Sequence, residues 1–232
     1  MLGLVEDAER ALGSAFQKEG DAIVLLDGAG KWSHAARDAY WKDFSALVKN
    51  SPQLEMAAIE KRLTGPSEDW RAFSSSEYAK TIHGIVAGAP PAMDLAAEKR
   101  LIECLVAVAS EGAILSAHDV SDGGLAVTLA ESCFGAEGLA AVFSLEGDEP
   151  AEAALFGERG ARAVVSLSPA SLARVSAIAA QYKVNAQRIG TVTRGEFRIQ
   201  YNGASVISGD VNSLRKVWSE SLVRAVEGTE NK

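Results

Sequence analysis

The 232-residue sequence has little of several things: two cysteines, three histidines, six prolines and 6% aromatic residues. Two cysteines without a Cys-x-x-Cys spacing argue against a disulfide framework and a structural zinc site. We therefore expect Cys104 and Cys133 to be reduced residues of the core. Basic residues are also scarce, with 23 against 31 acidic ones and a net charge of −8. This deficit argues against nucleic acid as the main partner, because phosphate neutralisation needs clustered lysine and arginine.

Long apolar runs are absent as well. No stretch approaches the ~20 residues of a membrane span, and the N-terminus lacks the basic region and apolar run of a signal peptide. We therefore expect a cytoplasmic protein with no membrane partner. The composition, 47% hydrophobic and 23% charged, is typical of a globular chain long enough to bury a core.

The apolar patterns predict a mixed sheet flanked by helices, an α/β or α+β fold, rather than an all-parallel sheet. Apolar runs between turn signals predict strands at residues 22–26, 113–117, 139–145 and 162–167, with a hairpin joining 189–192 to 196–201. Helical spacing predicts helices at about 78–82, 95–111, 125–134, 151–156, 169–180 and 211–226. The residues expected to face the core are Leu95, Ile102, Leu105, Val106 and Ala109 on the second helix, and Leu214, Val217, Trp218 and Leu222 on the last.

Residues 30–72 differ from the rest of the chain. They carry three of the four tryptophans and many charges, and two helical patterns fit them, at 34–49 and 52–63. We interpret this segment as a helical insertion on one face of the fold.

One segment, residues 116–134, has the pattern of a ligand site. A short strand leads into two carboxylates three residues apart, then two glycines, then a helix. The glycines and the helix N-terminus favour a bound phosphate, and the carboxylates favour Mg²⁺. The alternative is an ordinary loop in which Asp122 caps the helix. The candidate phosphate- or nucleotide-binding residues are His118, Asp119, Ser121, Asp122, Gly123 and Gly124.

Two further candidates flank a later glycine, between a predicted helix and a strand. Glu158 and Arg162 could join a phosphate site there, and the alternative is that an arginine of this segment, Arg159 or Arg162, pairs with a nearby carboxylate. The spacing supports no Ser/His/Asp or Cys/His arrangement and no G-x-G-x-x-G motif. We therefore assign no catalytic residue and no metal ligand set.

The run SAHDVSDGGLAV at residues 116–127 closely resembles the second-half signature of the phosphoribosylformylglycinamidine synthase (FGAM synthase II) family. Other matches follow in the same order and cover nearly the whole chain except residues 30–72. They lie at residues 3–7, 16–21, 76–78, 91–95, 155–162 and 189–190, and in the closing helix with Trp218. One departure is that Ser74 and Ser75 stand where the family usually has two glycines.

The resemblance implies a particular domain organisation. Residues 1–15 would be the end of a preceding ATP-binding ferredoxin-like domain, and residues 16–232 an AIR-synthetase-like C-terminal domain with the insertion at 30–72. The missing N-terminal domains of the same synthetase would be its partners, together with a glutaminase subunit or domain that supplies ammonia.

The resemblance also implies an activity, that of an ATP-dependent carbon–nitrogen ligase in purine biosynthesis. ATP·Mg phosphorylates a small phosphorylated substrate, formylglycinamide ribonucleotide, and ammonia then displaces phosphate to give the amidine. This chain would lack most catalytic residues and be inactive alone, contributing a phosphate or nucleotide contact at residues 118–124, joined by Glu158 and Arg162. The alternative is a packing and assembly module with a degenerate ligand site.

Overall fold

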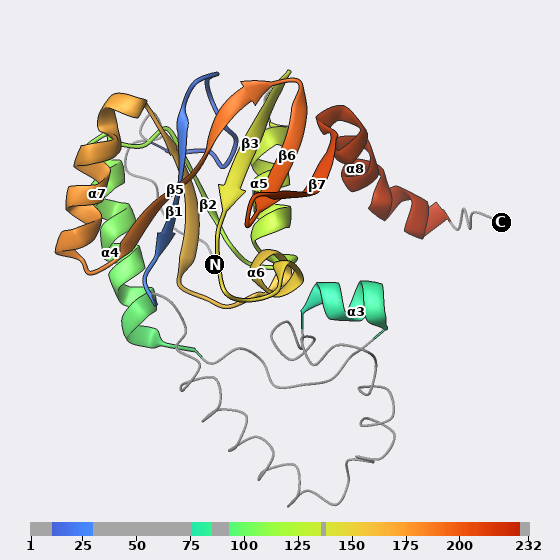
Figure 1. Ribbon diagram of the computed structural model, residues 1–232, viewed down its shortest axis with the longest axis horizontal. Coiled ribbons are helices and arrows are strands. Elements are labelled where there is room, and N and C mark those ends of the chain that lie inside the picture. The colour runs from blue at the N-terminus through green and yellow to red at the C-terminus, as the bar shows by residue number, and fades with distance from the viewer. Residues whose placement is uncertain (1–10, 30–75, 85–92, 136–137, 228–232) are drawn as a thin grey trace, which may run out of the picture.

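A computed structural model of the chain describes residues 11–29, 76–84, 93–135 and 138–227, which form a mixed sheet with helices on both faces (Figure 1). The seven strands of this sheet follow the order β2-β4-β1-β5-β3-β6-β7. Among the paired strands, β3 and β6 run parallel, and the other pairs are antiparallel. The predicted mixed sheet is therefore confirmed.

Most predicted elements are present, several with the predicted bounds. The strands are β1 (Ala22–Asp27), β2 (Ser116–Asp119), β3 (Leu139–Leu145), β4 (Arg162–Leu167), β5 (Asn185–Arg194), β6 (Glu196–Tyr201) and β7 (Ala204–Asp210). The described helices are α3 (Glu77–His83), α4 (Leu95–Ser110), α5 (Gly124–Phe134), α6 (Ala151–Phe156), α7 (Leu172–Gln181) after a short 3-10 turn (Pro169–Ser171), and α8 (Val211–Glu227).

Two apolar clusters, one on each face of the sheet, form the core. On one face α4 and α7 lie side by side (Figure 1) and bury Val108 and Val175 against β1 and β4. On the other face α5 buries Leu129 against a cluster that includes Phe143 and Phe197, whose ring centroids are 5.6 Å apart. Burying each such side chain contributes roughly 1.5–3 kcal/mol. The two clusters hold β2 and the N-terminus of α5 at one edge of the sheet.

The predicted hairpin across residues 193–195 is wrong. β5 and β6 do not pair, because β3 lies between them, antiparallel to β5 and parallel to β6. The observed hairpin joins β6 to β7 through Asn202 and Gly203, whose φ values of 50° and 79° fit the two-residue turn favoured by an Asn-Gly pair. The sequence carried this signal, and β7 was nevertheless missed.

The buried face of α4 also differs from the prediction. Ala97, Leu101, Cys104 and Val108 are buried, whereas Leu95, Ile102 and Val106 are exposed. Both sets have helical spacing, so periodicity alone does not choose between them. The small Ala97 faces inward at the point where the helix lies very close to the end of β1. A Cβ atom on Gly28 would lie only 2.5 Å from the carbonyl oxygen of Ala97.

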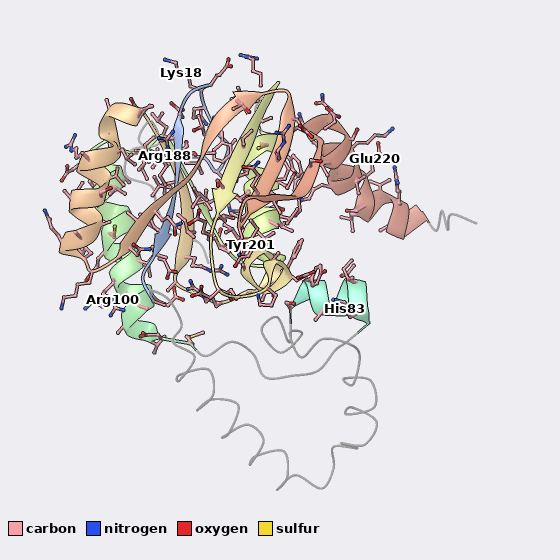
Figure 2. The ribbon with its side chains drawn as sticks, viewed as in Figure 1. Lys18, His83, Arg100, Arg188, Tyr201 and Glu220 are labelled. Atoms are coloured by element: carbon pink, nitrogen blue, oxygen red, sulfur yellow. The ribbon has the colours of Figure 1, made fainter. Side chains whose placement is uncertain are left out.

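The apolar side of α8 is likewise not buried as predicted. Leu214 is half-buried against the core, but Val217, Trp218 and Leu222 are all more than half exposed. The outer part of α8, where Glu220 lies, extends away from the sheet and the other helices (Figure 2). By contrast, Val175, Ile178 and Ala179 of α7 are buried as predicted.

Several predictions fall outside the described residues. The insertion at 30–72, Ser74, Ser75 and residues 1–10 belong to this group. The domain boundary near residue 15 stays a prediction. In the described part, the backbone N–H of Ala117 on β2 donates to the carbonyl of Gly13 (3.1 Å). No helix in the described ranges is long and apolar enough to cross a membrane.

Both cysteines are free and buried, on α4 and α5, as predicted for core residues. Burial raises the pKa of the Cys104 thiol, and it raises the pKa of Cys133 to about 12. Neither side chain is therefore a reactive thiolate at neutral pH.

Asp21, directly before β1, is an acidic residue buried at one end of the sheet, where Lys18 also lies (Figure 2). Its Oδ2 atom has no hydrogen-bond partner among the described residues. Desolvation by burial raises the pKa of Asp21, and the charge of Lys18 opposes this shift. An ionised Asp21 therefore destabilises the folded chain.

This burial predicts a pH dependence. Because the raised pKa makes the folded state bind more protons than the unfolded state, stability should fall as the pH rises from about 3.8 through the raised pKa. Asp21→Asn should remove this fall and stabilise the chain at pH 7, in urea unfolding between pH 4 and pH 7. Lys18→Gln should steepen the fall. Equal pH slopes for the wild type and both variants would contradict the prediction.

Candidate functional site

The candidate loop begins at the C-terminal end of β2, at one edge of the sheet. β2 starts three residues later than predicted, so His118 and Asp119 lie on the strand, paired with Val164 and Ala163 of β4. The buried Val120 continues this pairing by donating its N–H to the carbonyl of Arg162 (3.1 Å). Successive strand residues usually point to opposite faces, but at the end of this strand Oδ1 of Asp119 lies 3.4 Å from Nδ1 of His118.

The two glycines shape the entry to α5. Gly123 and Gly124 have φ values of 79° and 68°, in the left-handed region that glycine tolerates. Gly124 also packs closely on the end of α6, since a Cβ atom there would lie 2.8 Å from the carbonyl oxygen of Leu155. Gly123 is the N-cap of α5, and no side chain caps the helix. The alternative in which Asp122 caps α5 is therefore wrong.

The side chain of Glu158 fixes this loop through two hydrogen bonds. Its Oε1 atom accepts hydrogen bonds from the backbone N–H of Gly123 and of Glu77, both at 2.8 Å. One carboxylate oxygen thus joins the start of α5 to the first residue of α3. Aromatic stacking of Tyr78 on Phe156, with ring centroids 4.3 Å apart, supports the same junction.

His118 has partners at both ring nitrogens. Nδ1 lies 2.9 Å from the backbone oxygen of Asp119, and Nε2 lies 3.1 Å from Oε2 of Glu131 on α5. The other oxygen of Glu131 accepts a hydrogen bond from Nε1 of Trp218 (2.8 Å). Sequence reasoning missed Glu131 and assigned Trp218 only to an apolar helix face, because no local pattern links three residues so far apart in the chain.

Arg162 is buried at the start of β4, and its guanidinium group is engaged within the protein. Nη2 donates to the carbonyl of Gly157 and Nε to that of Arg159 (3.3 Å). Desolvation, together with the nearby charge of Arg159, lowers the pKa of Arg162 to about 10, so it stays protonated at neutral pH. Arg159 itself pairs with both carboxylate oxygens of Asp27 at the end of β1. The predicted alternative of carboxylate pairing thus holds for Arg159.

A cavity of about 370 Å³ lies beside the candidate loop, between α4 and the ends of β2 and β4. His118 and Asp119 line this cavity, whereas residues 121–124 do not. Glu98 of α4 lines it too, and its Oε1 accepts the N–H of Ala161 (2.6 Å). No local pattern indicated a role for Glu98. The full lining is Glu98, Leu101, Ile102, Leu105, residues 117–120 and residues 160–163.

The structure therefore brings the predicted residues into one region with two roles. Asp119, at the end of β2, and Ser121 and Asp122, on the loop, are exposed. Glu158 accepts the backbone N–H of Gly123 and so holds the loop. The side chain of Arg162 bonds to the carbonyls of Gly157 and Arg159. Within the described ranges, no three His, Cys, Asp or Glu side chains are grouped to hold a metal ion.

Known proteins resemble this chain in both sequence and structure. The profile of the family described as AIR synthase related protein, C-terminal domain, matches residues 63–202. Phosphoribosylformylglycinamidine synthase subunits PurL from Thermoanaerobacter sp. (strain X514) and Synechococcus sp. (strain WH7803) are 31% and 36% identical over 219 and 230 residues. These alignments cover 94% and 97% of this chain but 24% and 26% of the relatives. The chain thus spans about a quarter of their length.

Solved structures show the same fold. T. maritima PurL complexed with FGAR superposes with a TM-score of 0.61 at 22% identity, covering 90% of this chain and 30% of that one. T. maritima PurL complexed with ADP gives a TM-score of 0.59 at 19% identity, covering 90% and 27%. The predicted AIR-synthetase-like architecture is therefore confirmed.

Proposed function

Because this chain belongs to the AIR synthase related protein family, through the C-terminal domain of that family, we propose that it is the C-terminal part of a phosphoribosylformylglycinamidine synthase. The resemblance inferred from the signature at residues 116–127 is confirmed by this membership. The support for the more specific proposal is the similarity to PurL subunits along 94% or more of the chain.

The reaction proposed for the whole protein is the ATP- and Mg²⁺-dependent conversion of formylglycinamide ribonucleotide and ammonia into the amidine, in the cytoplasm. A glutaminase partner would supply the ammonia. This chain contributes one domain and no catalytic residue, so it is inactive alone. Its partners are the N-terminal domains of the same synthetase.

The role proposed for the site is to contact a phosphate or nucleotide. The observation that carries it is the start of α5, where two left-handed glycines open the helix and no side chain caps it. The carbonyl of Ser121 holds the N–H of Gly124 (2.9 Å), and the other N–H groups of the first turn, with the positive end of the helix, favour an anion. Asp119 and Asp122 are exposed beside it and would hold Mg²⁺ together with the phosphate oxygens. Glu158 occupies the N–H of Gly123, so we assign Glu158 and Arg162 to supporting the loop.

A thermal unfolding experiment tests this role. A ligand at 100 times its dissociation constant raises the free energy of unfolding by about 2.7 kcal/mol. We expect such a shift with ADP or ATP plus Mg²⁺, and expect Asp119→Ala/Asp122→Ala to abolish it. Glu103→Ala/Glu220→Ala, which removes two acidic side chains on α4 and α8, is the control and should keep the shift.

A second function, as a packing and assembly module, is favoured by the exposed apolar side chains of two helices. Leu95, Ile102 and Val106 on α4, and Leu222 and Val226 on α8, are all more than half exposed. Apolar surface of this kind marks interfaces. The absence of any nucleotide shift in the wild type would favour this second function over the first.

A further inference from the structure

We propose that Glu131 is a positioning residue that, held by Trp218 of α8, orients His118 and thereby the first residues of the candidate phosphate-binding loop. The proposal rests on the function assigned to that loop. It connects three elements far apart in the sequence, β2, α5 and α8, through one chain of hydrogen bonds.

The first step is the orientation of the carboxylate. Each oxygen of Glu131 has a different partner, Nε1 of Trp218 at 2.8 Å and Nε2 of His118 at 3.1 Å. Two partners on separate elements fix the plane of a carboxylate that a single partner would leave free to rotate. The indole N–H is a donor only, and an ionised carboxylate is an acceptor only. Glu131 therefore requires a proton on Nε2 of His118.

The second step is the link from His118 to the loop. Its ring is mostly buried, with 16% of the side chain exposed, and Nδ1 lies 2.9 Å from the backbone oxygen of Asp119. The same oxygen accepts a hydrogen bond from Oγ1 of Thr128 on α5 (3.1 Å). A carbonyl oxygen is an acceptor only, so the contact with Nδ1 requires a proton there as well, and the ring carries a proton on each nitrogen. His118 and Thr128 thus hold the Asp119 peptide from two sides. A fixed Asp119 peptide sets the direction in which the loop leaves β2.

The third step is the attachment of α8. The ring of Trp218 lies 5.6 Å from that of Phe134 at the end of α5. Beyond Trp218, the side chains of Leu222, Val223 and Val226 are more than half exposed. The indole is therefore a main contact between the outer part of α8 and the body of the domain, and its N–H reaches the residue that orients His118.

Nitrogen NMR of the histidine rings tests the proposal directly. The chain has only three histidines, and His118→Asn assigns the His118 signals by their loss. In wild type the shifts should report a proton on each ring nitrogen. In Glu131→Gln, the side-chain carbonyl can still accept from Trp218, so its NH₂ faces His118 and favours the tautomer with the proton on Nδ1. We expect the Nδ1 and Nε2 signals to change accordingly.

Two more variants complete the design. Trp218→Phe keeps a ring near Phe134 but removes the N–H donor, and should shift the His118 signals without removing the proton from Nε2. Glu220→Gln, on the same helix and paired with Arg224, is the matched control and should leave them unchanged. Unchanged His118 signals in both Glu131→Gln and Trp218→Phe would overturn the proposal. If Glu131→Gln does not fold, Trp218→Phe alone decides it.

Binding adds a second readout. Loss of the orienting bond in Glu131→Ala should weaken ADP binding about fivefold, the net effect of roughly one hydrogen bond, while Glu220→Gln should bind as wild type does. Unaltered ADP affinity in Glu131→Ala would overturn the link from the ring to the loop. A wild type that binds no nucleotide would defeat the proposed function instead, and the ring signals would still decide whether Glu131 orients His118.

Discussion

Gly124→Ala is expected to lower the free energy of unfolding by about 4 kcal/mol. A left-handed φ of 68° costs a non-glycine residue on the order of 1–2 kcal/mol. The new methyl group would also lie 2.8 Å from backbone atoms of Leu155 and Phe156, which belong to α6 and cannot move aside as a flexible side chain would. Such overpacking typically costs about 1–3 kcal/mol. Urea unfolding measures the sum.

Gly112→Ala is the matched control, because it separates the two costs. Gly112 has a similar φ of 62°, and a Cβ atom there would meet nothing within 4 Å. The variant should therefore lose only the cost of the left-handed backbone, about 1–2 kcal/mol. If the two variants were equally unstable, the close approach of α5 to α6 would not contribute. The same measurement in the presence of ADP would show whether Gly124→Ala also disturbs the candidate loop.

Asp27→Asn is expected to destabilise the chain by about 3 kcal/mol. The carboxylate pairs with both terminal nitrogens of Arg159, and the Asp27 side chain is only 9% exposed. The charge of Asp27 also acts on Arg162, where it opposes the lowering of that pKa by burial and by Arg159. Removing the Asp27 carboxylate leaves the guanidinium groups of Arg159 and Arg162 without its compensating negative charge. Breaking such a buried pair typically costs about 3–5 kcal/mol.

Two comparisons make this result interpretable in chemical denaturation. Asp27→Asn/Arg159→Gln removes the uncompensated charge together with the acid, so it should recover part of the loss. Glu111→Gln breaks an exposed pair with Arg174 and should cost less than about 1 kcal/mol. A double variant no more stable than Asp27→Asn would show that the pair itself, rather than the stranded charge, accounts for the loss.

Most elements and the place of the candidate loop follow from local patterns in the chain. β3, β4 and α6 have the predicted bounds, because an apolar run closed by turn residues is buried on either side of a sheet, whatever its neighbours. The loop was found because its chemistry is local. Two carboxylates, two glycines and a helix start lie within six residues.

The tertiary structure alone decided which strands pair and which helix faces are buried. β3 lies between β5 and β6. Strand pairing joins segments that are distant in the chain, and no local pattern encodes it. On α4 two sets of apolar residues both have helical spacing. The close approach of Gly28 to Ala97 selects the set that places a small side chain at this contact. For the same reason the roles of Glu158 and Glu131 emerged only in three dimensions, since each joins backbone or side chains brought together by the fold from up to 87 residues away.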